Sequence, residues 1–286
     1  MQHDLMVDVL ASLNSCSLGV ISFINLLHVV RCRINIAKRK YNCINHRRII
    51  VGRVHFHFSK NMEHNLADRC LHITEGRLRI HTTVTSNAST VVNFIRFVWI
   101  IYFNHAKHRV VGLDCEYTRH IRRKERRKLP LEKQDALASQ EPQRAAVLQL
   151  CVGKHCLVYQ LYQAHARGFV PPLLRQFLAD DRIKFAGAAI GNDIKKLEFY
   201  NLGIKNAVDL QQLGIKVPNH KEGQLVSLEK LAEKVAKIKL NKDKSVSLSL
   251  WESSNLNHEQ IKYASLDAYA SFEVFRQHFN ITGYLN

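Results

Sequence analysis

The sequence lacks the motifs of several common protein classes. Its seven cysteines are odd in number and scattered without a CxxC pair, which argues against a disulfide framework or a cysteine zinc site. Free thiols in a reducing compartment are the simplest interpretation. None of the 16 histidines belongs to an HExxH motif or to a close ligand set with cysteine. A phosphate-binding loop of the GxxxxGK(S/T) type is also missing, so we expect no P-loop nucleotide-hydrolysing module.

Acidic residues are scarce. The chain of 286 residues has 24 Asp and Glu against 42 Lys and Arg, a formal net charge of +18. A positive excess of this size favours a polyanionic partner, because Lys and Arg at phosphates release condensed counterions. Ribosomal, histone-like and membrane-surface proteins share this property, so the charge alone does not identify a function. With 46% hydrophobic residues, the chain is able to form an ordinary globular core.

Residues 1–75 fit no common pattern. Their largely apolar run, residues 18–30, is too short to span a bilayer. Asp4 and Asp8 stand where a signal peptide would have basic residues, and a mitochondrial presequence remains an alternative. We therefore expect a poorly ordered or atypical N-terminal extension over 1–75, followed by a single globular domain over 76–286.

From residue 77 onward the pattern is that of a folded α/β domain. Strands come first as a meander and then alternate with helices, which predicts a mixed sheet with helices on both faces. Asn257 and Gln260 form a capping-box pattern at the start of the last helix. The predicted strands are 78–84, 109–115, 147–152, 156–160, 183–188 and 207–210; the other predicted helices are 87–101, 171–178, 192–200 and 227–238.

Two carboxylates follow the most apolar of the predicted strands. Asp114 and Glu116 are two residues apart, so both side chains lie on one face of the sheet. Two carboxylates directed at one point repel each other, and a bound cation relieves that repulsion. A D-x-E pair alone is weak evidence, since most such pairs are simply solvated. Its place after Val110, Val111 and Leu113 favours a cation site.

A third carboxylate, Asp193, follows a predicted strand and Gly191 at the start of a predicted helix. On its own, such an Asp is best interpreted as a helix N-cap. An N-cap side chain is also able to face a neighbouring ion, so the two roles are compatible.

The last predicted helix carries Tyr263 and Asp267. Their i, i+4 spacing places them one turn apart on the same face. They flank a different, core-facing stripe, so a half-buried Tyr and a solvent-facing Asp would explain this pair in isolation. The core-facing stripe consists of Ile261, Ala264, Ala268, Phe272 and Phe275.

Taken together, the three carboxylate motifs resemble those of a known family. D-x-E on a first strand, Asp at a later helix and Y-x-x-x-D on a C-terminal helix resemble the DEDDy branch of the DnaQ-like 3′→5′ exonucleases. The likeness is greatest to the exonuclease domain of the Werner syndrome protein and similar stand-alone plant proteins, and it covers roughly residues 77–280. It implies a ribonuclease H-like fold. The segments that carry it are VVGLDCEYT (110–118), AAVLQLCVG (145–153), FAGAAIGNDIKKLE (185–198), LNKDKSVSLSLW (240–251) and EQIKYASLDAYASF (259–272).

This resemblance implies a two-metal active site that uses Mg²⁺ or Mn²⁺. Asp114 would bridge two divalent cations, and Glu116 and Asp267 would complete the site of the ion that activates water. Asp193 would serve the second ion, partly through water. Tyr263 would orient the attacking water, because a phenol with an ordinary pKa near ~10 is protonated at neutral pH. Carboxylates suit such hard cations, and two of them stabilise both ends of an in-line phosphodiester displacement.

Further basic residues are candidate nucleic-acid contacts. The segment 119–143 is longer and more basic than in the Werner domain, and we expect a long loop there that either grips a substrate strand or carries a nuclear-import signal. Within segment 240–251, Trp251 either touches the strand or fills the core beside the last helix. The candidate contacts are Arg122, Arg123, Arg126, Arg127, Lys242, Lys244 and Trp251.

The expected substrate is nucleic acid, with DNA favoured over RNA. An RNA-trimming exonuclease similar to ribonuclease D shares all five site residues and remains an alternative. A catalytically inactive binding module is another, although it would have no reason to keep four converging carboxylates. A membrane-surface protein would rest only on residues 18–30 and the charge. We expect a nuclear location, with the cytoplasm as the alternative.

Overall fold

The structure is a computed structural model that describes residues 68–104, 106–119, 143–168, 170–218, 223–241 and 243–284. The chain divides into two units, Met1–Asn61 and Met62–Asn286, and all described residues belong to the second. Residues 1–67 of the extension predicted over 1–75, and most of the basic segment 119–143, therefore lie outside the described residues.

The described part of the second unit is built on one mixed sheet in the order β1-β2-β5-β4-β3-β6-β7. β3 lies between β4, which is antiparallel to it, and β6, which is parallel to it. All six predicted strands are confirmed to within a few residues. The seven strands are β1 (Arg69–Glu75), β2 (Leu78–Thr85), β3 (Arg109–Tyr117), β4 (Ala145–Val152), β5 (His155–Tyr159), β6 (Ile183–Gly187) and β7 (Ala207–Asp209).

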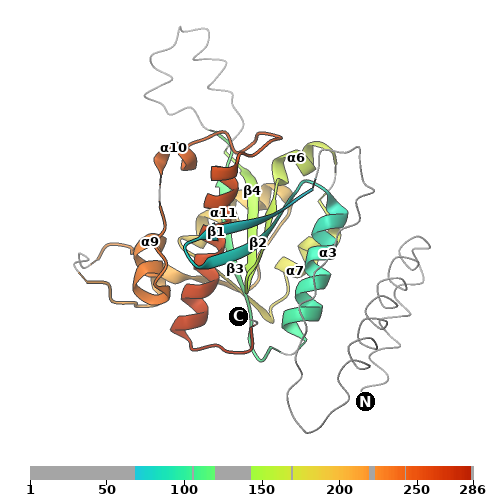
Figure 1. The fold of residues 1–286 in the computed structure, drawn as a ribbon. Coiled ribbons are helices and arrows are strands. Elements are labelled where there is room, and N and C mark those ends of the chain that lie inside the picture. Colours follow the sequence, from blue (N-terminus) through green and yellow to red (C-terminus); the bar gives the residue numbers. More distant parts are fainter. Residues whose placement is uncertain are drawn as a thin grey trace, which may run out of the picture. The chain divides into compact units, whose positions relative to one another are not determined.

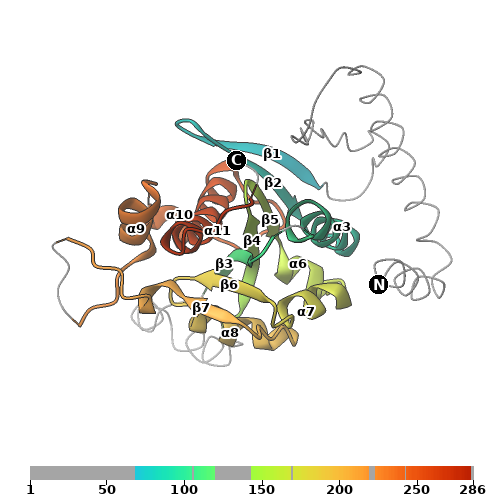
Figure 2. The same cartoon turned by 90° about the horizontal axis from the view of Figure 1, so that it is seen from below.

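Helices cover both faces of this sheet, as the alternation of elements predicts (Figures 1 and 2). α3, α6 and α7 lie on one side, and α9, α10 and α11 lie on the other, while α8 runs beside β6 and β7 (Figure 2). The described helices are α3 (Ala88–Val98), α6 (Leu161–Ala166), α7 (Pro172–Leu178), α8 (Ile190–Leu197), α9 (Leu228–Leu231), α10 (Lys244–Ser247) and α11 (His258–His278). None of them is long and apolar enough to cross a membrane.

Two predicted helices differ from the α-helices observed. The helix expected over 87–101 is α-helical only to Val98 and then continues as a π-helical turn, Trp99–Phe103. The helix expected over 227–238 consists of α9 and a second π-helical turn, Ala232–Ala236. In both cases the segment remains helical, as its apolar spacing predicts. A π-helical turn shifts the direction in which the side chains point, but it does not interrupt the helix.

The N-terminal boundary of the folded domain needs a correction. β1 lies within the segment expected to be an extension, but it pairs with β2 along its whole length, from Arg69 opposite Val84 to Glu75 opposite Leu78. Its sequence, RCLHITE, contains one fully buried residue, Ile73. An edge strand exposed on most positions has too weak a hydrophobic pattern to be recognised without its partner.

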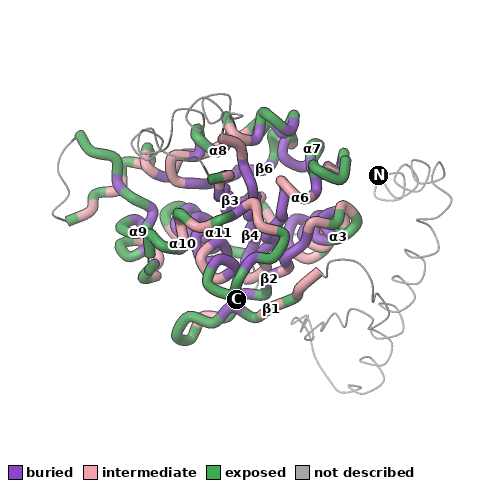
Figure 3. The backbone as a smooth tube through the Cα atoms, turned by 90° about the horizontal axis from the view of Figure 1, so that it is seen from above, coloured by how far each residue is buried: buried purple, intermediate pink, exposed green. Residues whose placement is uncertain are grey.

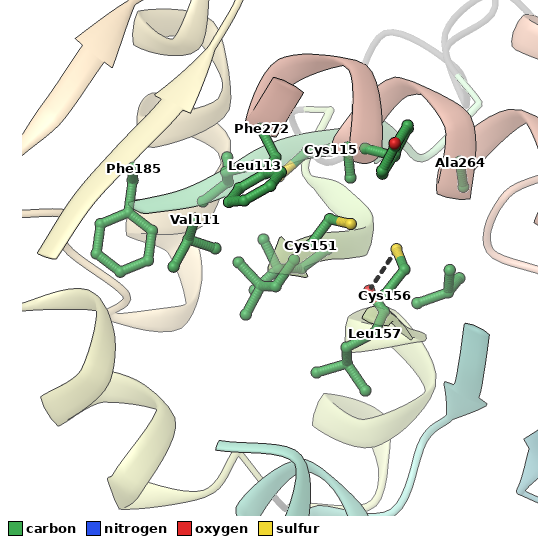
Figure 4. Close-up of a cluster of buried hydrophobic side chains, with 14 of the residues drawn as sticks. Val111, Leu113, Cys115, Cys151, Cys156, Leu157, Phe185, Ala264 and Phe272 are labelled. Carbon is green, nitrogen blue, oxygen red and sulfur yellow. Dashed lines mark hydrogen bonds between the residues drawn. The ribbon is translucent and has the colours of Figure 1, made fainter. Parts of the chain in front are cut away.

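The core lies between the sheet and its helices (Figure 3). β4 is buried along its whole length, as expected for a central strand covered on both faces. Figure 4 shows Phe272 of α11 and Phe185 of β6 lying against β3, with Cys151 and Cys156 in the same cluster. The described cysteines, Cys70, Cys115, Cys151 and Cys156, are all free thiols, as the sequence predicts.

Candidate active site

Three carboxylates converge where β3 meets α11. Asp114 and Glu116 come from β3, and Asp267 comes from the middle of α11. One carboxylate oxygen of each lies within 4.8 Å of one oxygen from each of the other two. They form the one group of three or more potential metal ligands among the described residues. The structure thus brings together residues 153 positions apart in the chain.

The close packing of α11 on β3 places Asp267. Gly112 lies two residues before Asp114, and a Cβ atom there would collide with the carbonyl oxygen of Ala268 and lie 2.5 Å from the amide nitrogen of Phe272. A glycine is therefore required for the helix to approach the strand this closely. Asn257 and Gln260 cap the start of α11 through reciprocal hydrogen bonds of 2.8 and 2.9 Å, so the predicted capping box is confirmed.

The site is largely, but not fully, shielded from solvent. Asp267 is 4% exposed and Glu116 is 9% exposed, while Asp114 is partly exposed. Ionised carboxylates at such distances repel one another, and limited water around them screens this repulsion only in part. A divalent cation with a preference for hard oxygen ligands relieves this repulsion, so the donor set fits Mg²⁺ or Mn²⁺.

Tyr263 lies one helical turn before Asp267 and faces the same three carboxylates. Burial raises the pKa of its hydroxyl, and the negative charges of Asp267, Glu116 and Asp114 raise it further. The expectation of an ordinary phenol pKa for Tyr263 is therefore wrong, because the pKa is higher than expected. The expected protonated state of the hydroxyl is reinforced by this difference. The hydroxyl stays protonated and is able to donate a hydrogen bond; it does not act as a base.

Asp193 is held apart from this group of three. It is 3% exposed in α8, and the N-cap of that helix is Ala189, so the N-cap interpretation of Asp193 is wrong. The Asp193 carboxylate instead accepts a 2.5 Å hydrogen bond from the hydroxyl of Tyr117, at the end of β3. Burial raises the pKa of Asp193 to about 7.

Two further residues, Tyr117 and Gln149, lie beside these carboxylates and belong to none of the predicted motifs. Tyr117 bonds to Asp193, and Gln149 of β4 lies directly opposite Asp114 in the β3–β4 ladder. The Gln149 side chain is completely buried, and neither of its amide atoms has a hydrogen-bond partner. An amide inside the otherwise apolar run AAVLQLCV was a signal in the sequence that such a position is special.

The predicted nucleic-acid contacts have different outcomes. Lys244 is exposed at the start of α10. Trp251 is only 1% exposed, and its ring centroid lies 6.2 Å from that of Tyr263. As a strand contact Trp251 is therefore wrong, and its alternative place in the core is confirmed. The remaining candidates, Arg122, Arg123, Arg126, Arg127 and Lys242, lie outside the described residues.

Known proteins share both the fold and parts of the sequence. The crystal structure of the Aedes aegypti Nibbler EXO domain superposes with a TM-score of 0.51 at 16% identity, covering 75% of this chain and 95% of that domain. A Drosophila grimshawi 3′-5′ exonuclease is 30% identical over 141 residues, 48% of this chain and 42% of its own length. An Arabidopsis thaliana 3′-5′ exonuclease is 29% identical over 138 residues, 47% of this chain and 46% of its own length.

The fold and the carboxylate site together are those of a ribonuclease H-like exonuclease domain, which confirms the predicted fold class. The family model for the 3′-5′ exonuclease domain matches residues 132–279, a segment that contains Asp193, Tyr263 and Asp267. The chain belongs to this 3′-5′ exonuclease family, so the expected enzyme class, a phosphodiester hydrolase, is confirmed at the family level. The chain spans less than half the length of the curated relatives it matches.

Proposed function

We propose that the protein hydrolyses the terminal phosphodiester bond at the 3′ end of a nucleic-acid strand and releases mononucleotides. One observation carries the proposal: the carboxylate oxygens of Asp114, Glu116 and Asp267 converge within 4.8 Å of one another, beside a protonated Tyr263. A group of this kind has no evident structural purpose, since the repulsion between its members destabilises the fold.

The chain's own residues divide the work of the reaction. Asp114, Glu116 and Asp267 would hold divalent cations, and Asp193 would complete the set from the side of α8. Once bound, two such cations, Mg²⁺ or Mn²⁺, would supply Lewis-acid stabilisation of the developing charge and would lower the pKa of a coordinated water. With such cations bound, water activation would need no protein base, which suits a ligand cluster made of carboxylates alone.

Tyr263 orients the attacking water. Its phenol donates a hydrogen bond and stays uncharged, because burial and the three carboxylates raise its pKa. The Trp251 ring lies beside the Tyr263 ring, with 6.2 Å between their centroids. A positioning group depends on such neighbours, since small displacements cost large factors in rate.

We further propose that the protein belongs to the DEDDy branch, close to the Werner syndrome exonuclease domain, and acts on DNA. The four-residue spacing of Tyr263 and Asp267 and the five quoted segments support this assignment. RNA trimming of the ribonuclease D type is the competing substrate preference. On the basic run 122–128 we also propose a nuclear location, which a fluorescent fusion with and without this run tests directly.

The decisive experiment is digestion of 5′-labelled DNA and RNA strands of matched sequence. In Mg²⁺ or Mn²⁺ the labelled DNA shortens one nucleotide at a time, and EDTA abolishes the reaction. A circular DNA without ends is the matched control and stays intact. Cleavage of the circle, or activity that persists in EDTA, contradicts an exonuclease; faster digestion of RNA overturns the DNA assignment alone.

A further inference from the structure

A groove next to Asp193 has the chemistry of a single-strand binding surface. Its volume is about 490 Å³, within the range of about 300–1,000 Å³ typical of small-ligand sites, and is large enough for a nucleotide unit. The groove is lined by Tyr117, Gln143, Arg144, Asn192, Lys195, Lys196 and Phe199. These residues come from the end of β3, the approach to β4, α8 and the 3-10 turn Glu198–Tyr200 that follows α8, and none of them is one of the four carboxylates or Tyr263.

We propose that this groove binds the sugar-phosphate backbone of a single nucleic-acid strand and stacks one of its bases on Phe199. The proposal rests on the proposed function, because it assigns part of the same substrate to a place outside the carboxylate site. It goes beyond that function because it names a second contact surface, the residues that form it, and a single strand as the form of nucleic acid that it binds.

Positive charge gathers along one side of the groove. Arg144, Lys195 and Lys196 bring three cationic groups to it. Neither lysine forms an ion pair with a described carboxylate, and the Lys196 ammonium lies 5.9 Å from the centroid of the Tyr117 ring. Two lysines without an ion pair to a described carboxylate are available to phosphates, and each such contact releases counterions from the strand.

An aromatic platform completes the groove. Phe199 is 45% exposed, although burying such a ring would be favourable. The Arg144 guanidinium lies 4.2 Å from its centroid, and the His165 and Tyr200 rings lie at 5.5 and 5.0 Å. These groups pack around the ring while part of it stays accessible to a ligand. Proteins that bind single strands combine such aromatic surfaces with a basic groove, because every base has a face that is able to stack.

Tyr117 connects the groove to the proposed catalytic carboxylates. It lines the groove and also donates its hydroxyl hydrogen to Asp193. A strand in the groove therefore lies next to Asp193, whereas a remote basic patch would not. This continuity favours nucleic acid over an acidic protein partner, which would need no path toward the carboxylates.

The test is binding of a fluorescently labelled single-stranded oligonucleotide to the full chain in EDTA, where no hydrolysis occurs. Lys195→Ala/Lys196→Ala is the main variant. Lys230→Ala/Lys234→Ala, which removes the same charge from exposed positions of α9 and the turn after it, is the matched control. The groove variant is expected to bind about tenfold more weakly, with a log–log salt slope shallower by about 0.7 per lost contact.

Phe199 provides a test without a change of charge. Phe199→Ala is expected to weaken binding about tenfold, and Phe199→Tyr, which keeps the ring, is expected to retain it. Equal affinities for the wild type, the lysine groove variant and its control overturn the proposal, as does an equal loss in the groove and control variants. A wild type that binds through the groove but cleaves nothing refutes the exonuclease function and leaves the groove standing.

Discussion

The hydroxyl of Tyr117 donates a 2.5 Å hydrogen bond to Oδ1 of Asp193 and thereby joins the end of β3 to α8. This bond favours the ionised carboxylate, while the burial of Asp193 disfavours it more strongly, so the pKa rises to about 7. Asp193 is consequently poised between its charged and neutral forms near neutral pH, unlike an exposed aspartate.

A pH-dependent stability follows for the metal-free protein. Between about pH 4 and pH 7 the folded state keeps a proton on Asp193 that the unfolded state has lost, so stability falls as the pH rises through this window. Asp193→Asn removes this contribution. We expect the difference in unfolding free energy between wild type and variant to change by a few kcal/mol across the window. Urea unfolding at several pH values measures it, and a difference independent of pH contradicts the prediction.

Asp267 and Tyr263 are expected to fail in different ways. Asp267→Ala removes a cation ligand, so cleavage should fall to near background and extra Mg²⁺ should restore little of it. Tyr263→Phe deletes one hydroxyl and should lower the rate roughly a hundredfold, with substrate affinity barely changed. Single-turnover cleavage and binding assays on both variants distinguish these effects. A Tyr263→Phe enzyme as fast as wild type, or an active Asp267→Ala enzyme, shows that these roles are misassigned.

Gln149→Leu is expected to stabilise the metal-free fold. Gln149 buries an amide whose two polar atoms have no partner, and leucine fills a similar volume without polar atoms. Removing a buried unsatisfied group of this kind contributes about 1–3 kcal/mol. Thermal and urea unfolding provide the measurement. A less stable Gln149→Leu protein means that the amide has a partner in solution, such as a buried water.

Two glycines allow a matched pair of substitutions. Gly112→Ala places a methyl group against the backbone of α11, so we expect a loss of about 3 kcal/mol or more together with weaker Mn²⁺ binding, because Asp267 moves with its helix. Gly191→Ala in α8 meets nothing within 4 Å and is expected to gain about 0.5–1 kcal/mol. Comparable stabilities for the two variants would show that α11 is free to shift away from β3.

The folded unit is expected to begin before β1. A fragment 62–286 keeps β1, with the hydrogen bond of 2.7 Å from Arg69 to the Leu256 carbonyl and the 2.7 Å ion pair between Glu75 and Lys262. A fragment 76–286 loses these contacts and leaves β2 as an unprotected edge, so it should melt at lower temperature and aggregate. Light scattering and thermal melts compare the two. Equal stability would mean that β1 is dispensable.

Local sequence was sufficient for the elements that carry the chemistry. The apolar, β-branched run before Asp114 predicted β3, and the period of a strand placed Asp114 and Glu116 on one face. The capping box and the four-residue spacing on α11 fixed where Tyr263 and Asp267 lie along their helix. These features depend only on neighbours in the chain, and the resemblance to a known family then supplied the expectation that the carboxylates act together.

Contacts between distant segments decided the rest. From sequence alone, Trp251 could be a surface contact or a core residue, and only its position beside α11 distinguishes the two. β1 is recognisable as a strand only because it pairs with β2. Asp193 looks like a helix cap until Tyr117, 76 residues earlier, is found bonded to its carboxylate. The sequence by itself determined which residue types stand at which positions of each strand and helix. Only the tertiary structure determined which of them are buried together. Burial and charge repulsion both depend on contacts between residues that are distant in the sequence.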